Sequence, residues 1–599
     1  MSEDTSYGVT RRQALKLGAG TLAGAAASVA ALQGAPLAAL AAAPSDLNEA
    51  TVVQLQSLMA KKKLRSVDLV DFYLRRIRSI DQSGPTVNSV IEVNPEAREI
   101  ASQLDHERRS RGSRGPLHGI PVLLKDNIDT HDHMQTAAGS LGLVGAPAAR
   151  DSTVAARLRA AGAVILGKTT LSEWANFRST TSTSGWSGRG GQCNNPYGIN
   201  RNPCGSSSGS GAAPSANFTA VSIGTETDGS IVCPANHNGV VGIKPTVGLV
   251  SRAGVVPISH IQDTVGPHTR TVADAAAVLG ALVGVDSRDA ATQASAGKFF
   301  SNYTQFLNPD GVRGARIGFT RQYEGSSPKT DAVFEQAVQA MANAGATMVE
   351  VQLPHFDEVN AGAAEFTVLL FDFKVDLKKY LASRTGVPLA HGDLAAAIAF
   401  NKAHAAQEMP FFGQEIFEMA QAVDTSDPAT IAAYNDAVAH DRFIGGTDGI
   451  DKALKDNNVL AVVAPTEPPA WSTDLIYGDH FTFGSSSHAA IAGYPIINVP
   501  MGLILGLPVG MSFMAGAFSE PTLIRLASGF EHVTHARRVP KFLPSLPVTS
   551  PSGASGDGGE GGGGEGGGGE GGGGGDDRRA AAARAQRALT RPAVKPKHL

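Results

Sequence analysis

The sequence predicts an α/β fold in which a mixed central β-sheet is covered by helices on both faces. Segments with helical periodicity alternate along the chain with short apolar runs that are typical of buried strands. Hydrophobic residues make up 42% and charged residues 18% of the 599 residues. This composition is ordinary for a globular enzyme, and the length allows a large buried core.

The predicted elements follow from local patterns. A first helix is predicted over 66–80 with Ser66 as its cap, and a second over 153–161 that ends at Gly162. Residues 286–456 are richer in helical pattern, and we expect a helical insertion there that helps to shape the substrate entrance. Apolar runs predict buried strands at 122–124, 163–166, 218–223 and 459–463.

Residues 1–43 are predicted to be an export signal. Arg11 and Arg12 precede a weakly apolar run, 17–32, and small residues at 38–43 suit a signal peptidase. The run is too short and too rich in Ala and Gly for stable membrane insertion. It resembles a twin-arginine signal, so we expect the twin-arginine export machinery to deliver a periplasmic or secreted protein. An N-terminal helix that is never cleaved is the alternative.

Residues 548–599 are predicted to be a glycine-rich linker followed by a basic tail. Glycine repeats interrupted by Glu560, Glu565 and Glu570 cannot bury a core. We expect a solvated, disordered tail, with contact to an acidic surface as the alternative. The formal charge of −4 on the whole chain is nearly balanced, so no nucleic-acid partner is expected.

Two ligand-binding possibilities are not favoured. The chain has three cysteines, Cys193, Cys204 and Cys233, without a C-x-x-C spacing, so a thiolate zinc site is not expected. We expect three thiols, with a Cys193–Cys204 bridge as the alternative. Residues 162–169 fit the P-loop pattern, but the intervening Ala-Val-Ile-Leu is typical of a strand rather than a phosphate-binding loop.

Two loops rich in glycine and serine are the candidates for chemistry. They span 204–211 and 224–230, and the strand-like segment 218–223 lies between them. Glycine permits the tight backbone turns through which successive N–H groups point inward. Such a nest ahead of Ser230 predicts an oxyanion hole, with a flexible Ser/Gly loop as the alternative.

A serine nucleophile needs a base, and the residues alone leave two candidates. His237 follows Ser230 by seven residues, so a Ser-His-Asp triad is possible. Lys125 follows the apolar run 122–124. A lysine normally has a pKa of about 10.4, but burial at the end of a strand can lower it by a few units and make the amine a usable base.

Four motifs together resemble the amidase signature family. They span 119–126, 205–211, 224–234 and 239–246, and their order and spacing agree with that family from about Asp46 to Pro544. The resemblance assigns residues 44–547 to one amidase catalytic domain. Within the family, 226–234 looks closest to the bacterial peptide amidases, which remove the C-terminal amide of peptides. Residues 485–487, 493–495 and 519–522 point the same way.

The resemblance implies a Ser–cis-Ser–Lys triad with Ser230 as nucleophile, Ser206 as bridging serine and Lys125 as base. It also implies an oxyanion hole made of backbone N–H groups, and it requires neither a metal nor an organic cofactor. Ser207 is the neighbour that could be mistaken for the bridging serine. The oxyanion-hole N–H groups fall on Thr227, Asp228, Gly229 and Ser230.

This sequence departs from the family pattern at two positions. Asp228 stands where the family usually has glycine, and Glu226 where it commonly has aspartate. Asp228 is expected to alter the substrate entrance or the oxyanion hole.

The expected substrate is a small-molecule or peptide amide, which is hydrolysed to a carboxylate and ammonia. Two other functions are compatible with the same fold. One is the A-type subunit of a tRNA-dependent amidotransferase, which would act in the cytosol. The other is an exported binding protein without turnover. The export signal disfavours the first, and intact Lys125, Ser206 and Ser230 disfavour the second.

Overall fold

The computed structural model describes residues 47–546. The predicted export signal, 1–43, and the predicted linker and tail, 548–599, lie outside the described residues. Among the described residues, no helix is both long enough and apolar enough to cross a membrane.

An 11-stranded mixed sheet forms the centre of the described chain, as predicted. Strands β3, β2 and β6 run parallel to one another, whereas β6, β8, β7, β12, β13 and β11 pair antiparallel in that order. At one edge β1 pairs antiparallel with β3, and at the other β11, β9 and β10 are parallel. The strands are β1 (Val90–Val93), β2 (Pro121–Lys125), β3 (Val164–Thr169), β6 (Val221–Glu226), β7 (Val241–Lys244), β8 (Thr264–Thr269), β9 (Arg316–Phe319), β10 (Thr347–Glu350), β11 (Val462–Pro465), β12 (Ile496–Ile504) and β13 (Leu507–Met514). A separate two-stranded sheet pairs β4 (Trp186–Ser187) with β5 (Gly191–Gln192).

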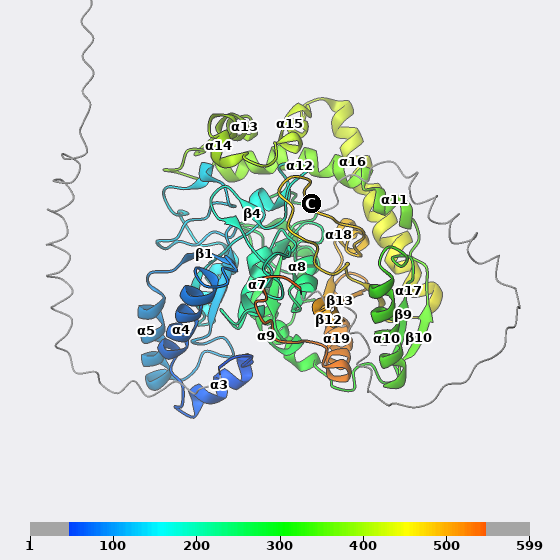
Figure 1. Cartoon of the computed structure of the whole chain (residues 1–599). Helices are drawn as coiled ribbons and strands as arrows, with labels where there is room; N and C mark the ends of the chain where they lie inside the picture. Colours follow the sequence, from blue (N-terminus) through cyan, green and yellow to red (C-terminus); the bar gives the residue numbers. More distant parts are fainter. Residues whose placement is uncertain (1–46, 547–599) are drawn as a thin grey trace, which may run out of the picture. The chain divides into compact units, whose positions relative to one another are not determined.

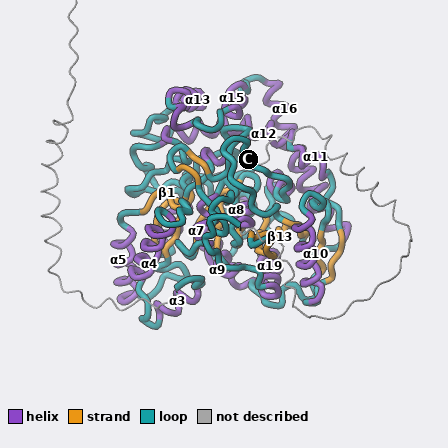
Figure 2. The backbone as a smooth tube through the Cα atoms, in the orientation of Figure 1, coloured by secondary structure: helices purple, strands orange, loops and turns teal. Residues whose placement is uncertain are grey.

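Helices flank the sheet on both faces, and Figure 2 shows most of the strands in the interior with helices around them. Most central strands are completely buried, which their continuous apolar runs predict. The α-helices are α3 (Val52–Ala60), α4 (Ser66–Arg76), α5 (Ala97–Arg111), α6 (Thr153–Ala160), α7 (Ser208–Ser215), α8 (Val232–His237), α9 (Val272–Leu282), α10 (Pro328–Asn343), α11 (Phe356–Ala361), α12 (Ala363–Leu381), α13 (Leu394–Ala403), α14 (Ala405–Glu408), α15 (Glu415–Ala422), α16 (Pro428–Arg442), α17 (Asp451–Asn457), α18 (Ser487–Ala492) and α19 (Glu520–Thr534). The described chain also contains two π-helical segments, Ile77–Asp81 and Phe443–Ile450, and four 3-10 helices, Leu141–Leu143, Glu173–Asn176, Ala290–Ser295 and Tyr303–Phe306.

The helix predicted over 66–80 differs from the observed one at both ends. Arg65 is the N-cap residue of α4, and Ser66 is its first residue. The Ser66 hydroxyl instead donates to the carbonyl of Gly119, which ties α4 to the segment before β2. The π-helical segment Ile77–Asp81 replaces the last predicted turn.

The helix predicted over 153–161 is α6, which Ser152 caps through the N–H of Ala155. The segment 162–169 is no phosphate-binding loop. Its residues from Val164 to Thr169 form β3, whose backbone is committed to β1 and β2.

Residues 286–456 are not helical throughout, because β9 and β10 lie within this range and extend the central sheet. The helices α12, α13, α15 and α16 gather at the top of Figure 1, away from α3 and α19. Buried apolar side chains of α12, including Leu369 and Phe373, pack in one cluster with Trp174 and Phe177. This cluster fixes α12 against the segment that follows β3.

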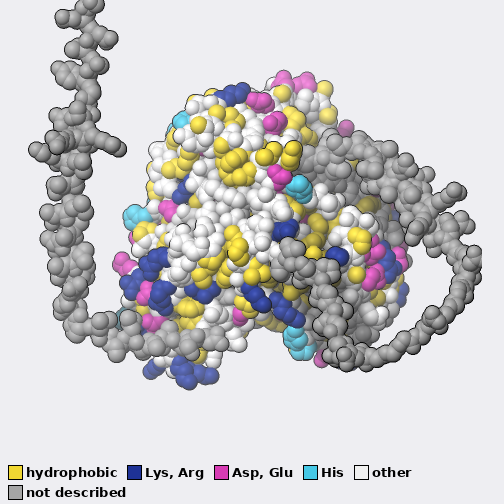
Figure 3. Space-filling model, in the orientation of Figure 1, with side chains coloured by type: hydrophobic (Ala, Val, Ile, Leu, Met, Phe, Trp, Pro, Cys, Tyr) yellow, Lys and Arg dark blue, Asp and Glu magenta, His cyan; other side chains and the backbone are white. Residues whose placement is uncertain are grey.

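Charged side chains of both signs lie together on the surface. In Figure 3, lysine and arginine side chains gather over α3, α4 and α5, and acidic side chains lie among them. Arg65 pairs with Asp68, and Arg114 pairs with Glu107. The basic surface is therefore partly neutralised where it is most evident.

Candidate active site

The strand order brings the predicted site residues to one edge of the sheet. β2 and β6 are adjacent and parallel, with Leu124 opposite Ile223. Lys125 ends β2, and the loop 227–230 follows β6. Because the carboxyl ends of parallel strands share an edge, the lysine and the second Gly/Ser loop become neighbours although Ser230 follows Lys125 by 105 positions.

The three predicted catalytic side chains form one hydrogen-bonded chain. Lys125 Nζ lies 2.8 Å from Ser206 Oγ, and Ser206 Oγ lies 3.0 Å from Ser230 Oγ. All three residues are almost completely buried. The Lys125 amine also donates to the hydroxyl and carbonyl oxygens of Thr225, at 2.8 and 3.2 Å. The geometry lets a proton pass from Ser230 to Ser206 and on to Lys125.

Burial determines the charge state of this lysine. Desolvation lowers the pKa of Lys125 to about 7, although the negative charges of Asp263 and Glu226 act in the opposite direction. A substantial fraction of the amine is thus neutral at physiological pH and able to accept a proton.

The loop before α7 turns sharply and separates the two candidate bridging serines. The Gly205–Ser206 peptide bond is cis. Only glycine fits at position 205, because a Cβ there would lie 2.2 Å from Ser172 Oγ. The hydroxyl of Ser207 donates to the carbonyl of Thr225 instead of meeting Ser230. Ser206, and not Ser207, therefore occupies the bridging position.

The loop 227–230 presents backbone N–H groups beside Ser230. Gly229 has a φ of 78°, a left-handed conformation that favours glycine. Within the described chain, no acceptor bonds the N–H groups of Gly229 or Ser230. The Glu226 carboxylate accepts the next two N–H groups, those of Ile231 and Val232. Glu226 thereby holds the start of α8, which leaves the preceding N–H groups for an oxyanion.

His237 does not take part in this arrangement. Its Nε2 lies 3.1 Å from the carbonyl oxygen of Pro468, and its ring packs edge-to-face on Trp471. Burial lowers the pKa of His237 to about 4. The Ser-His-Asp alternative is therefore wrong for this residue.

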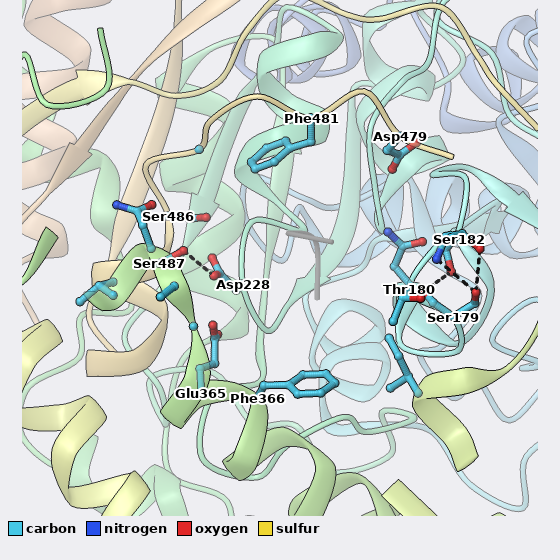
Figure 4. Close-up of a pocket in the computed structure, with 18 of the residues that line it drawn as sticks. Ser179, Thr180, Ser182, Asp228, Glu365, Phe366, Asp479, Phe481, Ser486 and Ser487 are labelled. Atoms are coloured by element: carbon cyan, nitrogen blue, oxygen red, sulfur yellow. Dashed lines mark hydrogen bonds between the residues drawn. The ribbon is translucent and has the colours of Figure 1, made fainter. Parts of the chain in front are cut away.

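A cavity of about 520 Å³ adjoins the loop through Asp228. Figure 4 shows Asp228 and Ser487 facing each other, with Phe481 and Phe366 on two other sides. Ser487 Oγ donates to the Asp228 carboxylate at 2.8 Å. Glu365, from α12, lines the same cavity, as do Ser179, Thr180 and Ser182. Segments far apart in the sequence thus line one cavity, which meets the loop 227–230 at Asp228.

The cysteine prediction is wrong. Cys204 forms a disulfide with Cys233, and Cys193 is buried and free. The pairing is non-local, since it joins the loop before Ser206 to the helix after Ser230, and spacing along the chain did not indicate it. The disulfide ties the loop that carries Ser206 to the helix that follows Ser230.

Among residues 47–546, two clusters contain residue types that ligate metals. One combines the disulfide cysteines with His237, and those sulfur atoms are bonded to each other. The other combines His260, Asp372 and Asp376, whose carboxylates accept hydrogen bonds from protein groups, including the Ser259 hydroxyl and the Lys379 amine. Neither cluster lies among the groups that bond Ser230.

Three residues with a role near the site were not predicted from the sequence. Thr225 holds the Lys125 amine, and Asn127 donates to the same threonine hydroxyl at 3.0 Å. Asp263 accepts a hydrogen bond from the Thr227 hydroxyl at 2.7 Å. Thr225 and Asn127 lie within or next to the motifs already noted, but Asp263 becomes a neighbour only through the pairing of β8 with β6.

Comparisons with known proteins agree with this geometry. The family model described as Amidase matches residues 68–524. A probable amidase of Arabidopsis thaliana is 41% identical over 508 residues, which cover 83% of this chain and 92% of that protein. The solved structure of native peptide amidase from Stenotrophomonas maltophilia is 49% identical with a TM-score of 0.78, and the match covers 83% of this chain and 100% of that one.

A more distant relative is an amidotransferase subunit. The A-type subunit of the glutamyl-tRNA(Gln) amidotransferase of Halorhodospira halophila is 32% identical over 505 residues, covering 82% of this chain and 98% of that protein. The amidases above are more similar. The chain therefore belongs to the amidase family, and it is a hydrolase that acts on amide C–N bonds.

Proposed function

We propose that this amidase removes ammonia from the C-terminal carboxamide of peptides outside the cytoplasm, with Ser230 as nucleophile, Ser206 as bridging serine and Lys125 as base. The observation that carries the proposed mechanism is the continuous chain of contacts from Lys125 Nζ through Ser206 Oγ to Ser230 Oγ. A binding protein without turnover would not require a buried lysine aligned in this way.

The proposed reaction has two halves. Ser206 accepts the Ser230 proton and passes its own to neutral Lys125, while Ser230 Oγ bonds the amide carbon. The oxyanion meets the N–H groups of the loop 227–230. The relay then returns a proton to the nitrogen, the C–N bond breaks and ammonia leaves. Water attacks the acyl-serine in the same way, and the carboxylate product and free Ser230 result.

The cavity supports the proposed substrate class. An enzyme that releases ammonia must hold the acyl part, since ammonia offers almost nothing to bind. The cavity of about 520 Å³ beside Asp228 has room for the residues that precede a peptide's terminal amide. Its lining mixes aromatic side chains with hydroxyl and carboxyl groups. The similarity to a peptide amidase structure, at 49% identity, supports the same choice.

Two features support the proposed location. Arg11 and Arg12 precede an Ala/Gly-rich run of the type that the twin-arginine machinery exports. The Cys204–Cys233 disulfide suits an oxidising compartment better than a reducing cytosol. Export also disfavours a role in a cytosolic amidotransferase.

A substrate panel tests the proposed specificity. We expect dipeptide amides to exceed acetamide in kcat/KM by at least about 10-fold, which corresponds to ~1.4 kcal/mol of transition-state binding. The same peptide as a free acid is the control. Only its internal peptide bonds could react, and we expect none of them to be cleaved. If simple aliphatic or aryl amides have the higher kcat/KM, the assignment as an amidase would stand and the assignment of peptide amides as substrates would be rejected.

A further inference from the structure

A short segment connects the wall of the cavity to the oxyanion loop. Residues 258–263 precede β8, whose first residue, Thr264, pairs with Glu226 at the end of β6. This register places Asp263 opposite Thr227, the first residue after β6. The two meet through the Thr227 hydroxyl, which donates to Asp263 Oδ1 at 2.7 Å.

The second oxygen of Asp263 holds its own segment in shape. Asp263 Oδ2 accepts the N–H groups of Ile258 and Ser259, at 2.8 and 3.1 Å. The carboxylate is buried, and hydrogen bonds from three donors fix its position. Asp263 therefore holds Thr227 in a fixed place relative to the segment 258–263.

The same segment is tied to α12 at three points along that helix. Gln262 Nε2 donates to Glu365, the Ser259 hydroxyl donates to Asp372, and the His260 N–H donates to Asp376. Their spacing, seven and then four residues, places the three acids on one face of α12. Because Glu365 also lines the cavity, the segment joins the cavity wall to the loop 227–230.

We propose that Asp263 is a positioning residue for the hydrolysis: it fixes Thr227, and through Thr227 the backbone N–H groups that receive the oxyanion. Its carboxylate also lies close to Lys125, because it bonds Thr227, two residues after the Thr225 that bonds the lysine amine, and its charge therefore acts on that amine. The proposal rests on the proposed roles of Ser230 and the loop 227–230. It concerns a residue outside the Gly/Ser motifs that touches neither substrate nor nucleophile.

The electrostatic part has a defined direction. Burial raises the pKa of Asp263 to about 6, so its carboxylate is mostly charged above that pH. A negative charge near Lys125 favours the protonated amine, which raises the lysine pKa. The other charged or titratable groups coupled to this pair are Glu226 and His268, which interact with Lys125, and Arg252, which interacts with Asp263.

The positioning part is tested with Thr227→Val, which removes the hydroxyl and keeps the shape. We expect kcat on a dipeptide amide to fall about 10-fold with KM changed less than about twofold, because a transition-state interaction is weakened. Thr227→Ser should restore kcat, since it keeps the hydroxyl. Thr264→Val is the matched control, because its buried hydroxyl bonds the Glu226 carbonyl and not Asp263.

The electrostatic part is tested with Asp263→Asn and the pH dependence of kcat/KM. Loss of the negative charge lowers the Lys125 pKa, so the acid limb should move to lower pH, while the limb of Thr227→Val should stay in place. An unmoved limb in Asp263→Asn would overturn this part. If Asp263→Asn fails to fold, the threonine variants still decide the positioning part.

Ser230→Ala measured alongside separates the possible failures. Retained turnover in that variant would reject the proposed nucleophile itself. Loss of turnover in Ser230→Ala together with wild-type kcat in Thr227→Val would reject only the role of Asp263. Equal losses of kcat in Thr227→Val and Thr264→Val would also reject it, because the effect would then be a general one of removing buried hydroxyls.

Discussion

Three lysines are buried in the described part of the chain, and their surroundings give them different roles. Lys244 donates to the carbonyl groups of Ala489 and Tyr494, and burial lowers its pKa to about 8. Lys168 donates to the carbonyl of Ile128 and to a threonine hydroxyl. Lys125 is the one that contacts a serine aligned with a second serine. Side-chain neighbours, rather than burial alone, distinguish a base from a structural cation.

The pKa of Lys125 leads to a prediction about pH. The amine must be neutral to accept a proton, and its pKa of about 7 means that the protonated form dominates below that pH. We expect kcat/KM to decline about tenfold per pH unit below a midpoint near 7. Lys125→Arg should be inactive throughout, because a guanidinium does not lose its proton in this range. An acid limb with no inflection between pH 5 and about 9 would contradict the assignment.

The nucleophile is tested by removing one oxygen atom. Ser230→Ala deletes the hydroxyl that Ser206 contacts and leaves the backbone N–H groups in place. We expect covalent labelling by a fluorophosphonate to disappear and amide hydrolysis to fall at least about 10³-fold with an unchanged melting temperature. Ser207→Ala is the neighbouring control, which should still be labelled. A labelled Ser230→Ala would place the nucleophile elsewhere.

At the scale of elements, the sequence predicted what depends on neighbours along the chain and missed what depends on pairing. The apolar runs predicted β2, β3 and β6 because burial on both faces leaves a continuous pattern. Lys125, Ser206 and Ser230 were identified because long motifs carry them. The Asp263 contact was missed because it arises from the pairing of β8 with β6, and the disulfide because the loop before α7 and the helix α8 meet only in the folded chain.

The disulfide between the serine loops is expected to stabilise the fold. It closes a loop with a sequence separation of 29 residues, for which the loss of chain entropy in the unfolded state corresponds to ~3–4 kcal/mol. Cys204→Ser should therefore lower the midpoint of thermal unfolding, measured by circular dichroism. Cys233→Ser should lower it by a similar amount.

The double variant distinguishes the bond from the individual side chains. Either single change removes the same bond, so the double variant should be little worse than each single one. Cys193→Ala is the control for loss of a buried thiol outside the disulfide. Additive losses in the double variant would indicate that the two thiols are separate.

The site depends on segments from most of the described chain. Lys125 comes from β2, the serines from the loops around α7 and β6, and the cavity from residues as distant as Asn176 and Ser487. The sequence could not predict which part of 286–456 reaches the cavity, because helical periodicity gives a buried face and not its partner. The range contains the sheet strands β9 and β10 as well as several helices, of which α11, α12 and α15 line the cavity.

Catalysis and export are expected to depend on separate parts of the chain. Every residue of the proposed machinery lies within 47–546, and the family match lies within 68–524. A chain limited to 44–547 should therefore keep the kcat/KM and melting temperature of the full-length protein to within about twofold and ~2 °C. The proposed export signal is expected to act only on location. Changing Arg11 and Arg12 together to lysine should leave the enzyme active but retained in the cytoplasm, because twin-arginine signals are read by a receptor that recognises the arginine pair.

The measurement is amidase activity in separated periplasmic, secreted and cytoplasmic fractions, with an unrelated exported hydrolase as the fractionation control. Equal export of the lysine variant, or a secreted protein that still begins at Met1, would reject the signal, whereas a large loss of activity in the 44–547 chain would show that a terminus takes part in the enzyme.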